Sequence, residues 1–383
     1  MGKGNVMEKK KVLFVINSIG YGGVERALTT ILSVPELSED FEVHLLLLDD
    51  EPIIRKFLPH VTLHVCNSKR KLLPSIVNFN KFVNELAPAV TISLLVRANV
   101  CNAIINGFLL RKNSIICERM HLSSHLEGQF PAFQNKVVKQ LPKLFYRFAT
   151  LALGVSTGVT SDLVENYSVK PDRAKTIFNP YNFQHIAEEA KKQPEFDLPE
   201  EFIVSVGRLT GSKNFQTLFE AYLASNEKAP LVVLGIGDLE DEFKKFIKDN
   251  NAEGRILLMG YSFNPYAIVS RAKYFIATSL NEGFPNAMAE AMVLGKPIIM
   301  SNCPSGPGEI LNETAELNIE EMLLGKYGVL VPMKNEVETT KAINFMQSDV
   351  ERERYASLAL SRSRDFELIK IASQYWDVIK NLA

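Results

Sequence analysis

Short apolar segments alternate with helix-forming segments along the chain, and this alternation limits the fold more than any other feature. Buried strands are predicted at residues 11–16, 41–48, 61–65, 89–95, 114–117 and 151–156, and again at 202–206, 231–234, 255–261, 274–277, 297–300 and 327–332. Helical segments such as 76–86 and 215–224 separate many of these strands. Strands that alternate with helices predict parallel, doubly wound sheets, so we expect an α/β protein.

Length and composition indicate two domains. A chain of 383 residues is long enough for two domains of ordinary size. Residues 187–199 are polar and charged and include Pro194 and Pro199, which is typical of a linker. We expect a first domain over 1–185 and a second over 196–364.

Other features of composition point to a cytoplasmic protein. The sequence holds no run of about twenty uncharged apolar residues, so no membrane-spanning helix is expected. Its start lacks the apolar core of a signal peptide. The four cysteines are scattered without metal-ligand spacing, which indicates reduced thiols. We expect neither a metal site nor a cofactor.

The two halves of the chain differ in charge. Residues 1–180 carry 22 Lys and Arg against 15 Asp and Glu, whereas the remainder carries 21 against 29. Residues 136–148 are predicted to form a basic amphipathic helix that Pro142 interrupts. Such a segment suits a peripheral contact with an anionic membrane surface, although an ordinary solvated helix is the alternative.

Two carboxylates belong to one strand–loop–helix unit at residues 274–297. Glu282 lies in the loop, and Glu290 lies about two turns along a helix predicted from Asn286 to Gly295. The helix start favours anions, and a carboxylate farther along can accept hydrogen bonds from vicinal hydroxyls such as those of a ribose. The alternative is that Glu282 caps the helix and that Glu290 is a solvated helix residue.

A second candidate binding segment follows the predicted strand at 202–206. Arg208 and Lys213 lie in a glycine-containing loop just before a helix. Two cations there can neutralise a diphosphate as it departs. The alternative is a pair of exposed loop cations.

The first half offers weaker candidates at the ends of its strands. Gly22 and Gly23 lie between a strand and a helix, without the lysine of a P-loop. Arg119, His121 and His125 follow the strand at 114–117, where open α/β sheets place ligands. A packing or surface role is the commoner one for a histidine.

These segments resemble the GT4 family of retaining glycosyltransferases. The motif S-x-x-E-G-F-x-N-x-x-x-E-A-M-x-x-G-x-P spans 279–297, and G-R-L-x-x-x-K-N spans 207–214. Further similar strings are G-G-V-E-R-A-L at 22–28, E-R at 118–119, I-x-N-P at 177–180 and C-P-S-G-P at 303–307. In the C-P-S-G-P segment, Gly308 stands where some members of the family carry a cation.

The resemblance implies a role for each matching residue. Glu282 would contact the donor sugar, Glu290 the nucleotide ribose, and Arg208 and Lys213 the donor diphosphate. The remaining candidates for substrate binding are Gly22, Gly23, Arg119, His121, Tyr261, Gly283, Phe284, Pro285 and Asn286. Tyr261 would lie beside the nucleotide base, and Arg119 matches the family better than His121 does.

The resemblance also implies a fold and an activity. The fold would be GT-B, with two Rossmann-like domains facing across a cleft and a last helix, near 365–383, returning to the first domain. The activity would be metal-independent, retaining hexosyl transfer from a UDP-sugar such as UDP-HexNAc to a glycan or polyprenyl-linked acceptor. That reaction belongs to surface polysaccharide or lipid-linked oligosaccharide assembly, and no nucleic acid partner is expected.

Two other functions remain open at this point. The same fold hosts nucleotide-sugar epimerases and hydrolases, and fold alone does not give function. A non-catalytic binding protein is the third possibility. An epimerase would act without an acceptor, and a binding protein of this kind would hold no nucleotide tightly.

Overall fold

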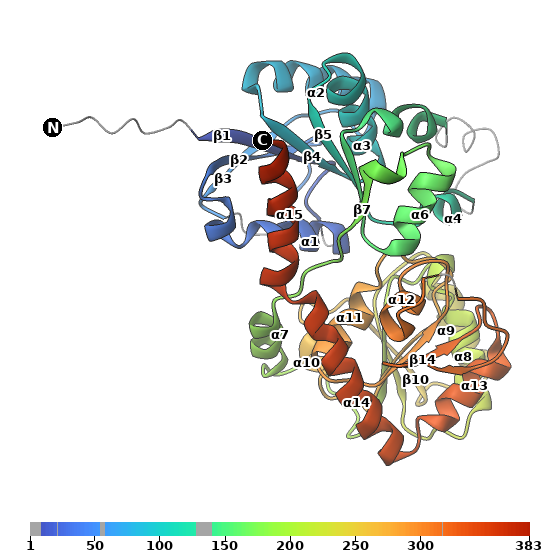
Figure 1. Ribbon diagram of the computed structural model, residues 1–383. Helices are drawn as coiled ribbons and strands as arrows, with labels where there is room; N and C mark the ends of the chain where they lie inside the picture. The colour runs from blue at the N-terminus through green and yellow to red at the C-terminus, as the bar shows by residue number, and fades with distance from the viewer. Residues whose placement is uncertain (1–8, 21, 54–57, 128–139, 316) are drawn as a thin grey trace. The chain divides into compact units, whose positions relative to one another are not determined.

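The computed structural model describes every residue except 1–8, 21, 54–57, 128–139 and 316. The chain divides into two compact units (Figure 1). Unit 1 comprises Met1–Pro180 and Leu368–Ala383, and unit 2 comprises Tyr181–Glu367. The polar segment 187–199 therefore falls inside unit 2, and its first residues belong to a helix, α7 (Phe183–Ala190).

Unit 1 contains a seven-stranded sheet in the order β3-β2-β1-β4-β5-β6-β7, and its strands pair in parallel. The strands are β1 (Lys10–Ile16), β2 (Phe41–Leu47), β3 (Val61–Val65), β4 (Val90–Leu94), β5 (Asn113–Glu118), β6 (Leu151–Gly154) and β7 (Ala174–Thr176). Parallel pairing requires crossover connections, which the helices supply. The helices are α1 (Gly23–Leu32), α2 (Leu72–Leu86), α3 (Val96–Asn102), α4 (Leu122–Glu127), α6 (Thr157–Asn166) and α15 (Leu368–Leu382).

The sheet of unit 1 is buried on both of its faces. Val12, Phe14 and Ile16 belong to one core cluster, together with Trp376 of α15. Leu13 and Val15 belong to another, which residues of α2 and α3 share. Because successive side chains of a strand point to opposite faces, both faces of β1 must be covered. Figure 1 shows α15, in red, beside the blue elements of this unit.

One element of unit 1 departs from the helix that periodicity predicts. The chain continues from α3 into a π-helix, η2 (Ala103–Leu109), before it turns into β5. A π-helix is wider than an α-helix and is uncommon. Gly107 is required in it, because a Cβ there would lie 2.7 Å from the carbonyl oxygen of Phe148.

Unit 2 contains a second seven-stranded sheet, in the order β10-β9-β8-β11-β12-β14-β13. The strands are β8 (Ile203–Val206), β9 (Leu231–Leu234), β10 (Ile256–Gly260), β11 (Phe275–Ala277), β12 (Ile298–Ser301), β13 (Leu323–Leu324) and β14 (Val329–Val331). Besides α7, the helices are α8 (Phe215–Ala224), α9 (Glu240–Asp249), α10 (Pro265–Val269), α11 (Asn286–Val293), α12 (Pro307–Asn312), α13 (Glu336–Phe345) and α14 (Asp349–Ser363). The sheet is parallel apart from β13, an antiparallel edge strand that the sequence did not predict.

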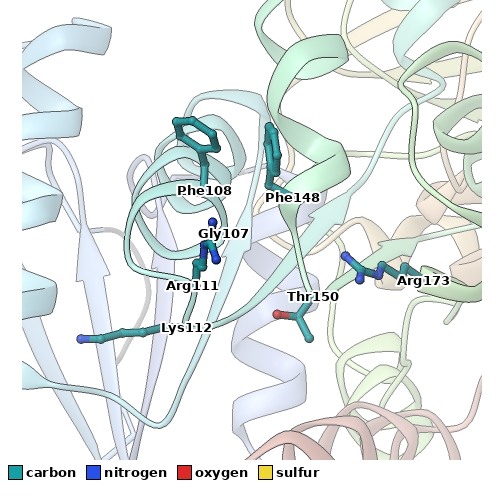
Figure 2. A pocket seen from close by; sticks show the side chains of 7 residues that line it. All are labelled: Gly107, Phe108, Arg111, Lys112, Phe148, Thr150 and Arg173. Carbon is teal, nitrogen blue, oxygen red and sulfur yellow. The ribbon is translucent and has the colours of Figure 1, made fainter.

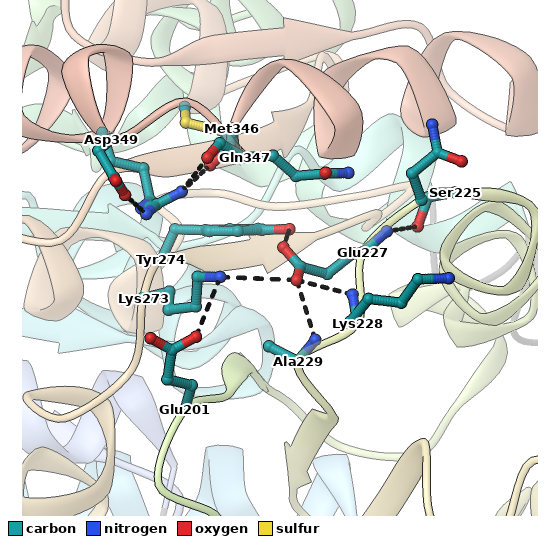
Figure 3. A network of polar contacts seen from close by, with 12 residues as sticks. Glu201, Ser225, Glu227, Lys228, Ala229, Lys273, Tyr274, Met346, Gln347 and Asp349 are labelled. Atoms are coloured by element: carbon teal, nitrogen blue, oxygen red, sulfur yellow. Dashed lines mark hydrogen bonds and ion pairs between the residues drawn. The ribbon is translucent and has the colours of Figure 1, made fainter.

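A buried polar network joins the amino ends of β9 and β11 in unit 2 (Figure 3). The Glu227 carboxylate accepts hydrogen bonds of 2.9 Å from the backbone N–H groups of Lys228 and Ala229. The Lys273 ammonium lies 3.6 Å from Glu227 and 3.5 Å from Glu201. Burial of a carboxylate is tolerated there because backbone donors and a cation surround it.

Candidate functional site

The strand order of unit 2 reverses between β8 and β11, and this fixes the place of the candidate site. β8 and β11 are neighbours in the sheet, while the chain proceeds from β8 to β9 and β10 on one side and from β11 to β12 on the other. The chain therefore continues from β8 and from β11 toward opposite edges of the sheet, and the carboxyl ends of two such strands are where open α/β sheets place ligands. Residues 207–214 form the first loop, and residues 278–285 form the second.

The two predicted loops are joined by an ion pair. Nζ of Lys213 lies 2.5 Å from Oε1 of Glu282, and 24% and 12% of these side chains are exposed. Lys213 ends a short 3-10 helix, η5 (Gly211–Lys213). The backbone N–H of Leu280 donates to the carbonyl of Ser212 at 2.8 Å. A cation and a carboxylate 69 positions apart are thus held side by side, still in reach of a ligand.

Glycines behind the first loop set its path. Gly235 has φ +145°, and a Cβ on it would lie 1.9 Å from the carbonyl oxygen of Gly207. Gly237 also lies close to Leu209, since a Cβ on Gly237 would lie 2.4 Å from the Leu209 carbonyl oxygen. The residues after β9 thus support residues 207–214, the cation loop that carries Arg208 and Lys213, by close backbone packing. Arg208 is exposed on this loop and forms no ion pair with any residue that the structure describes.

Glu290 occupies a buried position on α11 and has a hydrogen-bond partner. Its side chain is 7% exposed, and Oε1 accepts a hydrogen bond from the Tyr266 hydroxyl at 3.2 Å. A buried carboxylate requires such a partner. Sequence reasoning missed Tyr266, because nothing in the spacing between residues 266 and 290 indicates that α10 and α11 lie together.

The residues around Glu282 form a tightly held loop. Phe284 is 3% exposed and stacks on Tyr181 with ring centroids 6.2 Å apart. The Tyr181 hydroxyl donates to the Asn286 side chain at 2.6 Å, and the Ser305 hydroxyl donates to the Glu282 carbonyl at 2.5 Å. The predicted residues Gly283, Phe284, Pro285 and Asn286 thus include several that keep Glu282 in position.

The C-P-S-G-P segment packs against the same loop. Gly306 has φ +93°, and a Cβ on it would lie 2.7 Å from Cδ of Pro285. Gly308 is enclosed in a different way, because its Cβ would lie 2.8 Å from the Thr314 carbonyl oxygen. A long cationic side chain at 308 would therefore require its neighbours to move.

One unexpected polar atom belongs to the site. The side-chain oxygen of Asn281 is buried and has no hydrogen-bond partner among the described residues. A buried acceptor without a partner costs about 1–3 kcal/mol. Asn281 precedes Glu282 directly, so its amide is a candidate for ligand binding that sequence reasoning missed.

The described residues of the site provide neither a metal-binding cluster nor an ionised thiol. Among the described residues, no group of three or more His, Cys, Asp or Glu side chains could hold a metal ion. Burial raises the pKa of the Cys303 thiol, which also lies near Glu282, so this thiol stays protonated. Tyr261, after β10, is 38% exposed, and its ring meets Phe263 edge-on at 5.2 Å.

The candidates of unit 1 lie at the carboxyl edge of its own sheet. Gly22 and Gly23 begin α1, and a Cβ on Gly22 would meet only the flexible side chain of Glu25. Arg119 is 6% exposed and donates to the Tyr375 hydroxyl at 2.8 Å, while its other terminal nitrogen, Nη2, is buried and has no hydrogen-bond partner in the described part of the chain. Arg119 thus connects the end of β5 with α15.

His121 and Glu118 flank Arg119 in different environments. Nδ1 of His121 lies 2.9 Å from the Ser124 hydroxyl and 3.9 Å from the Asp162 carboxylate. Burial raises the pKa of Glu118 to about 7, although hydrogen bonds from Tyr146 and Asn99 counteract it. The side chain of His125 and the basic residues Lys136 and Lys139 lie outside the described residues.

Comparisons with known proteins show similarity to glycosyltransferases. Residues 186–358, within unit 2, match the family described as "Glycosyl transferases group 1". The chain is 29% identical over 375 residues to a Campylobacter jejuni N-acetylgalactosaminyltransferase whose named substrate is a diphospho-undecaprenol glycan; the match covers 95% of this chain and 97% of the relative. It is 23% identical over 317 residues to the Salmonella typhimurium lipopolysaccharide 1,6-galactosyltransferase, covering 79% and 82%.

Solved structures decide the fold. HepE from Anabaena, solved with UDP, superposes with a TM-score of 0.76 at 19% identity over 97% of this chain and all of that protein. The chain has the GT-B fold. Sucrose-phosphate synthase from Thermosynechococcus elongatus shares this GT-B fold, with a TM-score of 0.76 at 17% identity over 97% and 99%. The prediction of two Rossmann-like domains is therefore confirmed.

Proposed function

We propose that the chain is a retaining glycosyltransferase that transfers a hexosyl group from a UDP-sugar to a lipid-linked glycan. The observation that carries this proposal is the contact between Lys213 and Glu282 at the point where the strand order of unit 2 reverses. The names of the C. jejuni and Salmonella relatives, and UDP in the HepE structure, support the substrate classes.

The donor is assigned to unit 2. A lysine ammonium has three N–H donors, so Lys213 can keep its bond to Glu282 and still donate to a phosphate oxygen. Arg208, on the same loop, supplies a second charge that no described side chain neutralises. Glu282 can then accept a hydrogen bond from a sugar hydroxyl with its remaining oxygen. Glu290 is assigned to the ribose hydroxyls.

The transfer step breaks the bond between the sugar C1 and the β-phosphate oxygen and forms a bond between C1 and the acceptor oxygen on the same face. The bonding pair leaves with UDP, where Lys213 and Arg208 stabilise the growing negative charge. The proton of the acceptor hydroxyl passes to the departing phosphate oxygen. No separate protein base is needed in this scheme, and the basic unit 1 is assigned to the anionic acceptor.

Initial-rate assays with UDP-sugars and a polyprenyl-diphosphate glycan test the proposal. Lys213→Met should lower kcat/KM by roughly 10²–10³-fold, the usual loss when a donor to a developing oxyanion is removed. Lys228→Met, which removes an exposed charge on the same unit, is the matched control and should leave the rate unchanged. NMR of the product should show the anomeric configuration of the donor.

Two results would reject this function. Failure of UDP, GDP and ADP sugars to bind in calorimetry, with and without EDTA, would favour a non-catalytic protein. Epimerisation or hydrolysis of the sugar at full rate without an acceptor would favour the epimerase or hydrolase alternative.

A further inference from the structure

A pocket lies in unit 1, at the edge of its sheet opposite to the candidate residues of that unit. Its lining residues are Gly107, Phe108, Arg111, Lys112, Phe148, Thr150 and Arg173, and its volume is about 480 Å³ (Figure 2). Arg111 and Lys112 precede β5, Thr150 precedes β6 and Arg173 precedes β7. The pocket is therefore at the amino ends of three adjacent strands, whereas Gly22, Arg119 and His121 follow carboxyl ends.

Positive charge gathers at this pocket without a counter-ion from the described part of the chain. Arg111, Lys112 and Arg173 come from two segments about sixty residues apart, and none of the three forms an ion pair there. Asp172 is next to Arg173 in sequence but does not line the pocket. Figure 2 shows Arg111 and Arg173 on opposite sides of the hollow and Lys112 pointing away. Like charges placed together attract an anion.

The pocket also has an aromatic wall. The rings of Phe108 and Phe148 lie 4.7 Å apart, and Phe108 is 46% exposed. The π-helix η2 presents Phe108, and Gly107 allows the backbone of Phe148 to approach it. Arg147 extends the positive surface, with its guanidinium carbon 5.0 Å from the Phe148 ring. Cations and exposed rings together suit a ligand that is anionic at one end and apolar or planar at the other.

We propose that this pocket binds a phosphate ester, with Arg111 and Arg173 on the phosphate and Phe108 and Phe148 against the group esterified to it. Guanidinium groups match a phosphate because their N–H groups form paired, charge-assisted hydrogen bonds. The pocket volume falls in the range of small-molecule sites. The ester can come from a soluble metabolite or from the headgroup of an anionic phospholipid, and binding experiments separate these sources.

The test compares two double variants with the same loss of charge. Arg111→Asn with Arg173→Gln removes both pocket guanidinium groups, and Asn tolerates the positive φ of +52° at position 111. Lys170→Gln with Lys175→Gln removes two exposed cations near Arg173 that do not line the pocket. Every protein also carries Arg208→Ala, so that the cation loop of unit 2 contributes less, and melting curves confirm folding.

Phenyl phosphate is the soluble probe, and phosphatidylcholine vesicles with and without phosphatidylglycerol are the lipid probe. The pocket variant should lose at least about tenfold in affinity for one of them, while the control loses less than about twofold. A loss for phenyl phosphate alone assigns a soluble ester, and a loss for the charged vesicles alone assigns a headgroup. Phe108→Ala should weaken binding of the same probe that the pocket variant loses, but not binding of inorganic phosphate.

Three results would overturn the proposal. Failure of both probes to bind the parent protein would show that the pocket takes no phosphate-ester ligand. An equal loss of affinity in both double variants would show that binding depends on general surface charge and not on the pocket. An unchanged affinity of Phe108→Ala for the probe whose binding the pocket variant loses would show that the aromatic wall takes no part in the site.

Discussion

The residues of the candidate site differ in how far sequence reasoning could define them. The loop and helix positions of Glu282, Glu290 and Lys213 follow from local patterns, and the structure has them on those elements. The contact between Lys213 and Glu282 joins residues 69 positions apart, and that between Arg119 and Tyr375 joins residues 256 apart. Such contacts depend on strand order, which no local pattern contains.

Removal of the Tyr266 hydroxyl should weaken nucleotide binding through Glu290. Tyr266→Phe deletes the donor that holds Oε1 of Glu290, so we expect the Kd for UDP to rise roughly two- to tenfold. Calorimetry of Tyr266→Phe, Glu290→Gln and the double variant measures the coupling between the two side chains. Strictly additive losses would mean that Tyr266 does not act through Glu290.

Glu118 should make the stability of unit 1 depend on pH. Because burial raises its pKa to about 7 from 4.5, the folded state binds more protons than the unfolded state in this window. The unfolding free energy should therefore fall as pH rises from about 4.5 to 7, by up to about 1.4 kcal/mol per pH unit. Glu118→Gln should abolish this component.

Urea unfolding at several pH values checks this prediction. Trp376, the single tryptophan of the chain, belongs to the core of unit 1, so its fluorescence follows that unit. The exposed Glu165→Gln is the control and should keep the parental slope. A Glu118→Gln protein with an unchanged slope would assign the pH dependence to other groups.

Regular elements were more predictable than irregular ones. Alternating apolar segments predicted both parallel sheets, because burial on two faces leaves a clear signal. The π-helix Ala103–Leu109 and the two-residue strand Leu323–Leu324 were missed. Residues 103–109 are mostly apolar, so their sequence shows no period that separates a π-helix from an α-helix, and two residues are too few to show a period.

The connection between α8 and β9 offers a test of how strand ends are stabilised. Glu227 is 3% exposed and binds two backbone N–H groups, whereas Glu201 is 72% exposed, yet both contact Lys273. Glu227→Ala should destabilise unit 2 by about 2–4 kcal/mol, because it leaves two backbone N–H groups without their acceptor and leaves Lys273 paired, among the described residues, only with the exposed Glu201. Glu201→Ala should change stability by less than about 0.5 kcal/mol.

Denaturant titration followed by circular dichroism compares these two variants. Similar losses would show that the Lys273 ion pairs, rather than the buried backbone donors, stabilise this region.

At the scale of the whole molecule, the two units differ in whether they consist of one chain segment or two. Unit 2 is one continuous segment, Tyr181–Glu367, that holds its own sheet and core. Unit 1 needs α15 as well, whose Trp376 packs on Phe14 and Phe41 with ring centroids 5.8 and 6.0 Å apart. The entry and exit of unit 2 meet, because Tyr181 N–H donates to the Phe366 carbonyl at 2.9 Å.

Fragments should therefore behave differently. Residues 181–367 alone should fold, with dispersed NMR signals and a cooperative melting transition. Residues 1–180 should lack such a transition until a peptide of residues 368–383 is added, because Phe14 and Phe41 otherwise lose the aromatic cover of α15. A sharp transition of 1–180 by itself would show that α15 is dispensable for this core.

The discontinuity of unit 1 has a consequence for synthesis on the ribosome. Translation adds roughly 5–20 residues per second, so about 10–40 s separate the emergence of Pro180 from that of Leu368. During this interval the nascent first unit presents an uncovered apolar face, while the later unit can already finish folding. We therefore expect unit 2 to finish folding before unit 1, so that the order of folding is the reverse of the order of translation.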